Sequence, residues 1–142
     1  MRIEVMSKSV IERYSGKCNE DAAIVVSIYS HNMDKAAIIE SETNKIVDII
    51  FLEFNDTDSR DDKFSMQSEQ AKQLKEFIRV HLGDDNFDKI IVQCEAGQSR
   101  SAGVAAAIMK YFNNDDTPIF NNPRYTPNML CYRKTLEELM NQ

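Results

Sequence analysis

Three short apolar runs rich in Ile and Val restrict how this chain of 142 residues can fold. They span residues 22–29, 46–54 and 89–93, and β-branched runs of this length are typical of strands buried on both faces of a sheet. Residues 3–6 can add one more short strand. Strands of this kind, separated by helices, predict a mainly parallel sheet covered by helices.

A helical pattern lies between the second and third runs. Residues 66–82 carry apolar side chains at helical spacing: Ala71, Leu74, Phe77, Ile78 and Leu82. Ser65 is placed to cap the start of this helix, and Gly83 follows its last turn. Strand, helix and strand together predict a β-α-β unit.

Two further helices are expected after the third strand. Residues 102–112 are rich in Ala and apolar around most of the circumference, which predicts a helix buried against the sheet. Pro127 and Asn128 open a last amphipathic helix. Residues 1–142 are therefore expected to form a single α/β domain with three layers, in which helices flank a central, mainly parallel sheet of four to five strands. Ligands of such folds bind beyond the carboxyl ends of the strands.

Acidic residues outnumber basic ones, with 23 Asp and Glu against 17 Lys and Arg and a net charge of −6. Such a surface repels nucleic acid and acidic lipid, so an anion site must be a local group of donors. The longest apolar stretches fall short of the roughly 20 residues of a membrane span. The first residues show neither a signal peptide nor a transit peptide. We expect a cytoplasmic monomer that binds neither nucleic acid nor membrane.

Three cysteines, Cys18, Cys94 and Cys131, form no Cys-x-x-Cys pair, and the two histidines do not cluster with them. This spacing argues against a structural zinc site and against a disulfide scaffold. We expect reduced thiols and no metal or other cofactor.

Residues 94–100 follow the third strand and lead directly into the Ala-rich helix. The backbone N–H groups of such a loop can converge on an anion, and the helix dipole adds about half a positive charge at the same end. Gly97 permits a turn that a Cβ can obstruct. This segment is called the anion loop below. Its expected phosphate-binding residues are Glu95, Ala96, Gly97, Gln98, Ser99 and Arg100.

Three side chains of this region have the chemistry of covalent phosphoryl transfer. Helix N-termini and nearby cations favour ionised thiols, so Cys94 is expected to be a thiolate at neutral pH and to act as the nucleophile. Arg100 can hold two phosphate oxygens in a planar fork, which Lys cannot do. Ser101 can donate its hydroxyl to the sulfur when the sulfur leaves. Cys94, Arg100 and Ser101 are therefore candidate catalytic residues.

Residues 94–101 resemble the Cys-x5-Arg-Ser/Thr signature of the cysteine-dependent protein tyrosine phosphatases, most closely of their dual-specificity branch. Residues 122–128 look like the C-terminal segment of small bacterial and phage members. The resemblance implies a tyrosine-phosphatase-like fold and hydrolysis of a phosphomonoester through a cysteinyl-phosphate intermediate, without a metal. The substrate is then a phosphorylated protein or a small phosphomonoester.

Residues 54–58 lie where this family carries its general acid, which implies that Asp56 is the proton donor. Asp58, Asp61 and Asp62 lie in the same polar segment and stay open as alternatives. One position departs from the family, because Gln93 stands where a histidine usually precedes the nucleophile.

Two other functions are compatible with the same loop. A catalytically weak module can capture a phosphorylated partner, since Gln93 adds no charge beside the sulfur. A sulfurtransferase or an arsenate reductase also uses a thiolate loop. An arsenate reductase needs a resolving cysteine, which here must be Cys18 or Cys131.

Overall fold

The structure is a computed structural model that describes residues 1–41, 43–83 and 86–141. Four strands pair in parallel and form one sheet in the order β1-β4-β2-β3. Their bounds are β1 Arg2–Met6, β2 Ala23–Tyr29, β3 Ile46–Glu53 and β4 Lys89–Gln93. The predicted parallel sheet and the short N-terminal strand are confirmed.

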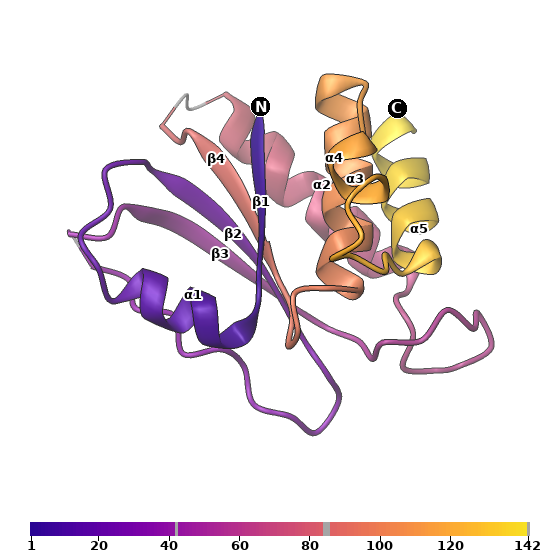
Figure 1. Cartoon of the computed structure of the whole chain (residues 1–142). Helices are drawn as coiled ribbons and strands as arrows, with labels where there is room; N and C mark the ends of the chain where they lie inside the picture. The colour runs from indigo at the N-terminus through magenta and orange to yellow at the C-terminus, as the bar shows by residue number, and fades with distance from the viewer. Residues whose placement is uncertain (42, 84–85, 142) are drawn as a thin grey trace.

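Helices cover both faces of the sheet, which gives three layers (Figure 1). One face carries α2 (Ser68–Leu82), α3 (Arg100–Asn113) and α5 (Met129–Met140), and α4 (Thr117–Phe120) is a short helix between α3 and α5. The other face carries α1 (Lys8–Ser15).

The side chains of strand β2 pack into an apolar core on each face of the sheet. Ile24, Val26 and Ile28 belong to the core under α2, α3 and α5, whereas Val25 packs in a smaller core with Ile11 of α1. Successive side chains of a strand point to opposite faces, so a strand buried on both sides is apolar throughout. The three-layer expectation is therefore confirmed.

The start of α2 differs from the prediction. The helix begins at Ser68, and Gln67 rather than Ser65 is its N-cap. Gln67 and Gln70 form a reciprocal capping box, in which the Gln70 side chain accepts from the Gln67 N–H at 2.8 Å. The Ser65 hydroxyl instead donates to the carbonyl of Asp62. The prediction of Ser65 as the cap was therefore wrong.

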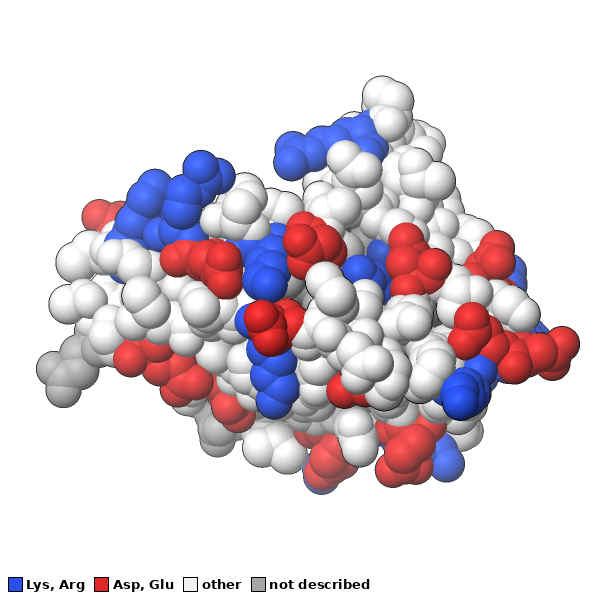
Figure 2. Space-filling model, turned by 90° about the horizontal axis from the view of Figure 1, so that it is seen from below, with Lys and Arg blue, Asp and Glu red and all other residues white. Residues whose placement is uncertain are grey.

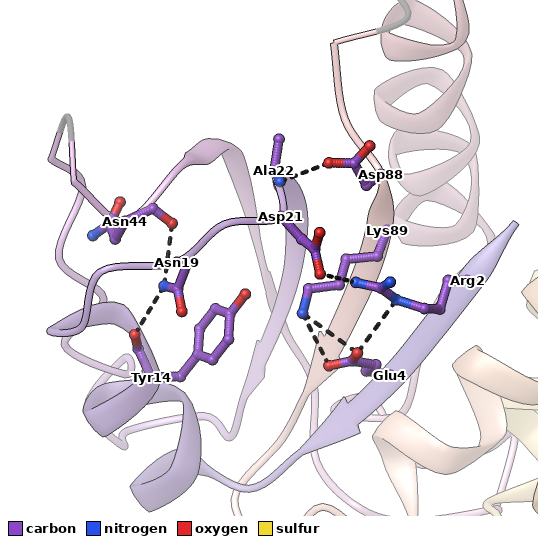
Figure 3. Close-up of polar contacts among 9 residues, drawn as sticks. All are labelled: Arg2, Glu4, Tyr14, Asn19, Asp21, Ala22, Asn44, Asp88 and Lys89. Carbon is purple, nitrogen blue, oxygen red and sulfur yellow. Dashed lines mark hydrogen bonds and ion pairs between the residues drawn. The ribbon is translucent and has the colours of Figure 1, made fainter.

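A polar network ties together the amino ends of the strands (Figure 3). Lys89, at the start of β4, is only 5% exposed, and its Nζ lies 3.3 Å from both carboxylate oxygens of Glu4 on β1. Burial lowers the pKa of Lys89, but Tyr14 and Glu4 outweigh it and leave the pKa raised. Arg2 pairs with Asp21 at 2.7 Å. The charged groups of this end therefore largely satisfy one another.

The described residues contain no helix that is both long and apolar enough to cross a membrane. The carboxyl ends of β2, β3 and β4 lie at the opposite end of the sheet from the polar network, where the chain forms loops (Figure 1). The site predicted from the sequence lies at this end of the sheet.

Candidate active site

The anion loop joins β4 to α3 and packs against the junction between β1 and α1. The Lys8 N–H donates to the carbonyl of Glu95 at 3.1 Å. Gly97 has a φ of +67°, and a Cβ there would lie 2.7 Å from the backbone nitrogen of Ser7. Only glycine fits both the backbone conformation and the space. The predicted need for glycine in this turn is confirmed, and the reason is a contact with an N-terminal segment.

Cys94 is the first residue of the loop and is 2% exposed. Its Sγ lies 3.0 Å from the hydroxyl oxygen of Ser101, which is buried in the first turn of α3. The structure thus brings together the candidate nucleophile and the hydroxyl expected to assist its departure. Both side chains stand at the N-terminal end of α3, where backbone N–H groups are free to meet an anion.

Arg100 begins α3 and is 6% exposed, so its guanidinium is buried. Its Nη1 donates to the Ser30 hydroxyl at 2.8 Å and to the carbonyl of Phe54 at 2.9 Å. Both partners are neutral, and no Asp or Glu of the described residues forms an ion pair with Arg100. A buried cation without a counter-charge is costly. The site therefore favours an anion beside Arg100.

A cavity of about 70 Å³ lies against Arg100. It is bounded by the end of β2, the following loop, the start of α1 and the anion loop, and its lining includes Lys8, Ser30, Asp34 and Glu95. Figure 2 views the molecule from this end, and basic and acidic side chains alternate across the face. Attraction for an anion must therefore come from local donors rather than from a broad basic patch.

Asp56 lies in the loop between β3 and α2, which is called the acid loop below. Its Oδ1 accepts hydrogen bonds from the Ser99 hydroxyl at 2.7 Å and from the Asn128 amide at 3.0 Å. Asp62 instead accepts from the backbone N–H of Phe64 at 2.9 Å, within its own turn. Asp56 is therefore the aspartate that contacts the anion loop. Its role as the acid stays a prediction.

The other two candidate aspartates, Asp58 and Asp61, are exposed in the acid loop. Neither has a side-chain hydrogen bond to the anion loop among the described contacts. The structure therefore separates Asp58 and Asp61 from the anion loop, although both lie close to Asp56 in sequence.

Asn128 is a site residue that sequence reasoning placed only at the start of the last helix. That part is confirmed, because its Oδ1 accepts from the Cys131 N–H at 3.1 Å and caps α5. The same amide reaches Asp56, and the backbone N–H of Asn128 donates to the carbonyl of Ser99 at 3.0 Å. The sequence held one signal of this contact, because a glycine inside a helix, here Gly103, can mark the close approach of another segment. In the structure a Cβ at Gly103 would lie 2.3 Å from the carbonyl oxygen of Asn128.

Gln93, at the position of the family histidine, is buried at the end of β4. Its side-chain oxygen accepts a hydrogen bond from the hydroxyl of Ser27 on β2. The bond links two central strands next to the anion loop. Gln93 therefore orders this end of the sheet but brings no charge to Cys94.

The remaining cysteines lie in different surroundings. Cys131 is buried in the first turn of α5, and burial, with a further effect of Asp56, raises the pKa of its thiol. A thiol held in the protonated form is a poor nucleophile. Cys18 is exposed between α1 and β2, and all three cysteines are free. In the described part of the chain, no three His, Cys, Asp or Glu side chains gather as metal ligands do.

The sequence pattern of the Rit1 DUSP-like domain family matches residues 51–141, well over half of the chain. The chain belongs to this family. The matched segment contains the acid loop, the anion loop and α5. The sequence matches no curated protein.

Solved structures of phosphatases share the fold. The PTP-2 phosphatase of Cydia pomonella aligns with 96% of this chain and 85% of its own at 14% identity and a TM-score of 0.62. Human DUSP28 aligns with 96% of this chain and 90% of its own at 12% identity and a TM-score of 0.57. The active form of Tk-PTP aligns with 100% of this chain and 94% of its own at 13% identity and a TM-score of 0.55.

These likenesses show a tyrosine and dual-specificity phosphatase fold, as the sequence resemblance implied. They do not bear on the resemblance of residues 122–128 to small bacterial and phage members, which stays a prediction.

Proposed function

We propose that the chain hydrolyses phosphomonoesters through a cysteinyl-phosphate intermediate. The buried Arg100 guanidinium is the observation that carries this proposal, because its hydrogen bonds go to neutral groups of Ser30 and Phe54 and no described carboxylate pairs with it directly. A phosphate bound at the N-terminus of α3 supplies the missing negative charge and meets the backbone N–H groups of the anion loop. The substrate is a phosphorylated protein or a small phosphomonoester.

The first step transfers the phosphoryl group to the protein. The thiolate of Cys94 attacks phosphorus, so that an S–P bond forms while the bond to the ester oxygen breaks. Arg100 and the loop N–H groups hold the equatorial oxygens, over which charge spreads in the transition state. Asp56 gives its proton to the departing oxygen, which leaves as an alcohol or phenol.

The second step releases phosphate. A water molecule attacks the phosphorus of the cysteinyl-phosphate, and the Asp56 carboxylate takes one of its protons. The S–P bond breaks and its electron pair returns to Cys94 as a thiolate. Ser101, whose hydroxyl lies 3.0 Å from that sulfur, donates a hydrogen bond to it as it leaves.

Phosphate release from para-nitrophenyl phosphate in EDTA tests the proposal. The wild-type chain is expected to turn over, and Cys94→Ser to fall below about a hundredth of the wild-type rate, because a serine hydroxyl is not ionised at neutral pH. Orthovanadate binding should persist in Cys94→Ser, since Arg100 and the loop donors remain. Activity of Cys94→Ser above that level would exclude the covalent mechanism.

A phosphate-binding module without turnover is the second candidate. Gln93 favours it, because a buried neutral amide bound to Ser27 adds no positive charge beside Cys94. Orthovanadate binding by a wild-type protein that releases no phosphate would select this function.

A further inference from the structure

Asn128 connects the three segments that build the site, and it is only 7% exposed. Its amide nitrogen donates to Asp56 Oδ1 at 3.0 Å and to the carbonyl of Thr57 at 3.1 Å, both in the acid loop. Its backbone N–H donates to the carbonyl of Ser99 in the anion loop, and its Oδ1 accepts from Cys131 in α5. All of its side-chain polar atoms are thus engaged.

The position of Asn128 itself is fixed by α3. The carbonyl oxygen of Asn128 approaches Gly103 so closely that any larger residue at 103 would clash. Gly103 lies in the first turns of the helix that begins at Arg100. A short path of contacts therefore runs from the helix that bears Arg100, through the buried Asn128, to the exposed Asp56.

The bonds to Asp56 also determine which of its oxygens can carry a proton. Oδ1 accepts hydrogen bonds from two donors, the Ser99 hydroxyl and the Asn128 amide. A proton on Oδ1 would point at these donors and weaken both hydrogen bonds. A protonated Asp56 therefore holds its proton on Oδ2. The second bond, from the Asn128 amide to Thr57, fixes the backbone immediately after the aspartate.

We infer that Asn128 is a positioning residue, which sets both the register of the acid loop and the oxygen from which Asp56 delivers its proton. This inference rests on the proposed phosphatase function. Four aspartates compete in the acid loop, and its middle part is exposed. The two bonds from the Asn128 amide select Asp56, because they hold that residue and its neighbour against the anion loop.

Asn128→Ser separates this role from helix capping. Serine is as good an N-cap as asparagine, so α5 keeps its start, while both bonds from the amide nitrogen are lost. Asn128→Asp is the second variant, since it keeps the cap and the size but replaces the donor with a carboxylate that faces Asp56. Either variant alone suffices for the test if the other fails to fold.

Asn19→Ser is the matched control. The Asn19 amide also bridges backbone carbonyls, those of Tyr14, Lys17 and Asn44, but it lies at the far end of the molecule, beside the polar network of the strand starts (Figure 3). Its loss removes a similar number of hydrogen bonds without touching the site.

The readout is kcat/KM, from phosphate release, with phenyl phosphate and with para-nitrophenyl phosphate. Phenolate leaves poorly without a proton, whereas para-nitrophenolate leaves readily. We expect Asn128→Ser to lose about 10- to 100-fold with phenyl phosphate and less than about threefold with para-nitrophenyl phosphate. In an Asp56→Asn background the same change should cost nothing further, and Asn19→Ser should match the wild type with both substrates.

Equal losses of Asn128→Ser and Asn128→Asp on the two substrates would overturn the inference and reduce Asn128 to a structural role. An additional loss with phenyl phosphate in the Asp56→Asn background would do the same. A wild-type protein that hydrolyses neither substrate would overturn the proposed function, and the inference with it. The wild-type rate therefore distinguishes the two failures.

Discussion

Ser99 and Asp56 join the two loops of the site directly, because the Ser99 hydroxyl donates to Asp56 Oδ1 at 2.7 Å across 43 positions of sequence. Ser99 belongs to the anion loop and immediately precedes Arg100. The group that binds an anion and the group proposed to protonate its leaving oxygen are therefore in contact before any substrate arrives. Preorganisation of this kind lowers the cost of orienting catalytic groups in the transition state.

Arg100→Lys is expected to lower kcat/KM for para-nitrophenyl phosphate by about 10²- to 10³-fold. An ammonium cannot donate to both Ser30 and Phe54 while it also forms a planar fork on phosphate. Steady-state kinetics should show both a higher KM and a lower kcat. Arg79→Lys, on the exposed face of α2, is the control. Unchanged kinetics in Arg100→Lys would make Arg100 a packing residue.

Ser101→Ala should slow breakdown of the cysteinyl-phosphate more than its formation. The Ser101 hydroxyl lies 3.0 Å from Cys94 Sγ and assists the sulfur only when the sulfur becomes a leaving group. Rapid mixing with para-nitrophenyl phosphate should then show a burst of nitrophenolate followed by a slow steady state. A slower burst with an unchanged later rate would contradict this role.

Tyr132 is expected to make the free energy of unfolding fall as the pH rises above about 10. Burial, and then the hydrogen bond to Asp116 at 2.6 Å, raise the pKa of its hydroxyl to about 12. An unfolded tyrosine ionises near pH 10, so this contribution to the free energy of unfolding is complete below about pH 10 and is lost as the pH rises towards about 12. The fall in Tm across that window should be smaller in Tyr132→Phe than in the wild type. Tyr111→Phe, at an exposed position, should fall as the wild type does.

The parts of the fold that follow from nearby residues were predictable. β2 has a continuous apolar sequence because its two faces pack against different cores, through Val25 on one side and Val26 on the other. One loop contains Cys94, Gly97 and Arg100. Their spacing in the sequence was therefore enough to predict a phosphate site.

Contacts between distant segments were not predictable. Asn128 and Asp56 are 72 positions apart, and nothing in the local sequence of either residue indicates the other. Gly97 is glycine because Ser7 packs against it, which requires the position of α1. That helix was missed because it has only eight residues, fewer than the window over which helical periodicity is read from a sequence.

The general acid can be identified by its dependence on the leaving group. A proton donor matters most when the departing oxygen is a poor leaving group, so Asp56→Asn should cost about 10²- to 10⁴-fold in kcat/KM with phenyl phosphate or a phosphotyrosine peptide. The loss should be far smaller with para-nitrophenyl phosphate.

Asp58→Asn, Asp61→Asn and Asp62→Asn are the matched controls for this prediction, since they make the same change within the same loop. Each variant should keep the wild-type ratio of kcat/KM between the two substrates. Of the four aspartates, Asp56 is the one that the described contacts join to Ser99 and Asn128. A leaving-group-dependent loss in Asp58→Asn but not in Asp56→Asn would mean that the acid loop moves by two residues when substrate binds. The bonds from the Asn128 amide would then have to break in every catalytic cycle, and Asn128→Ser should speed the reaction rather than slow it.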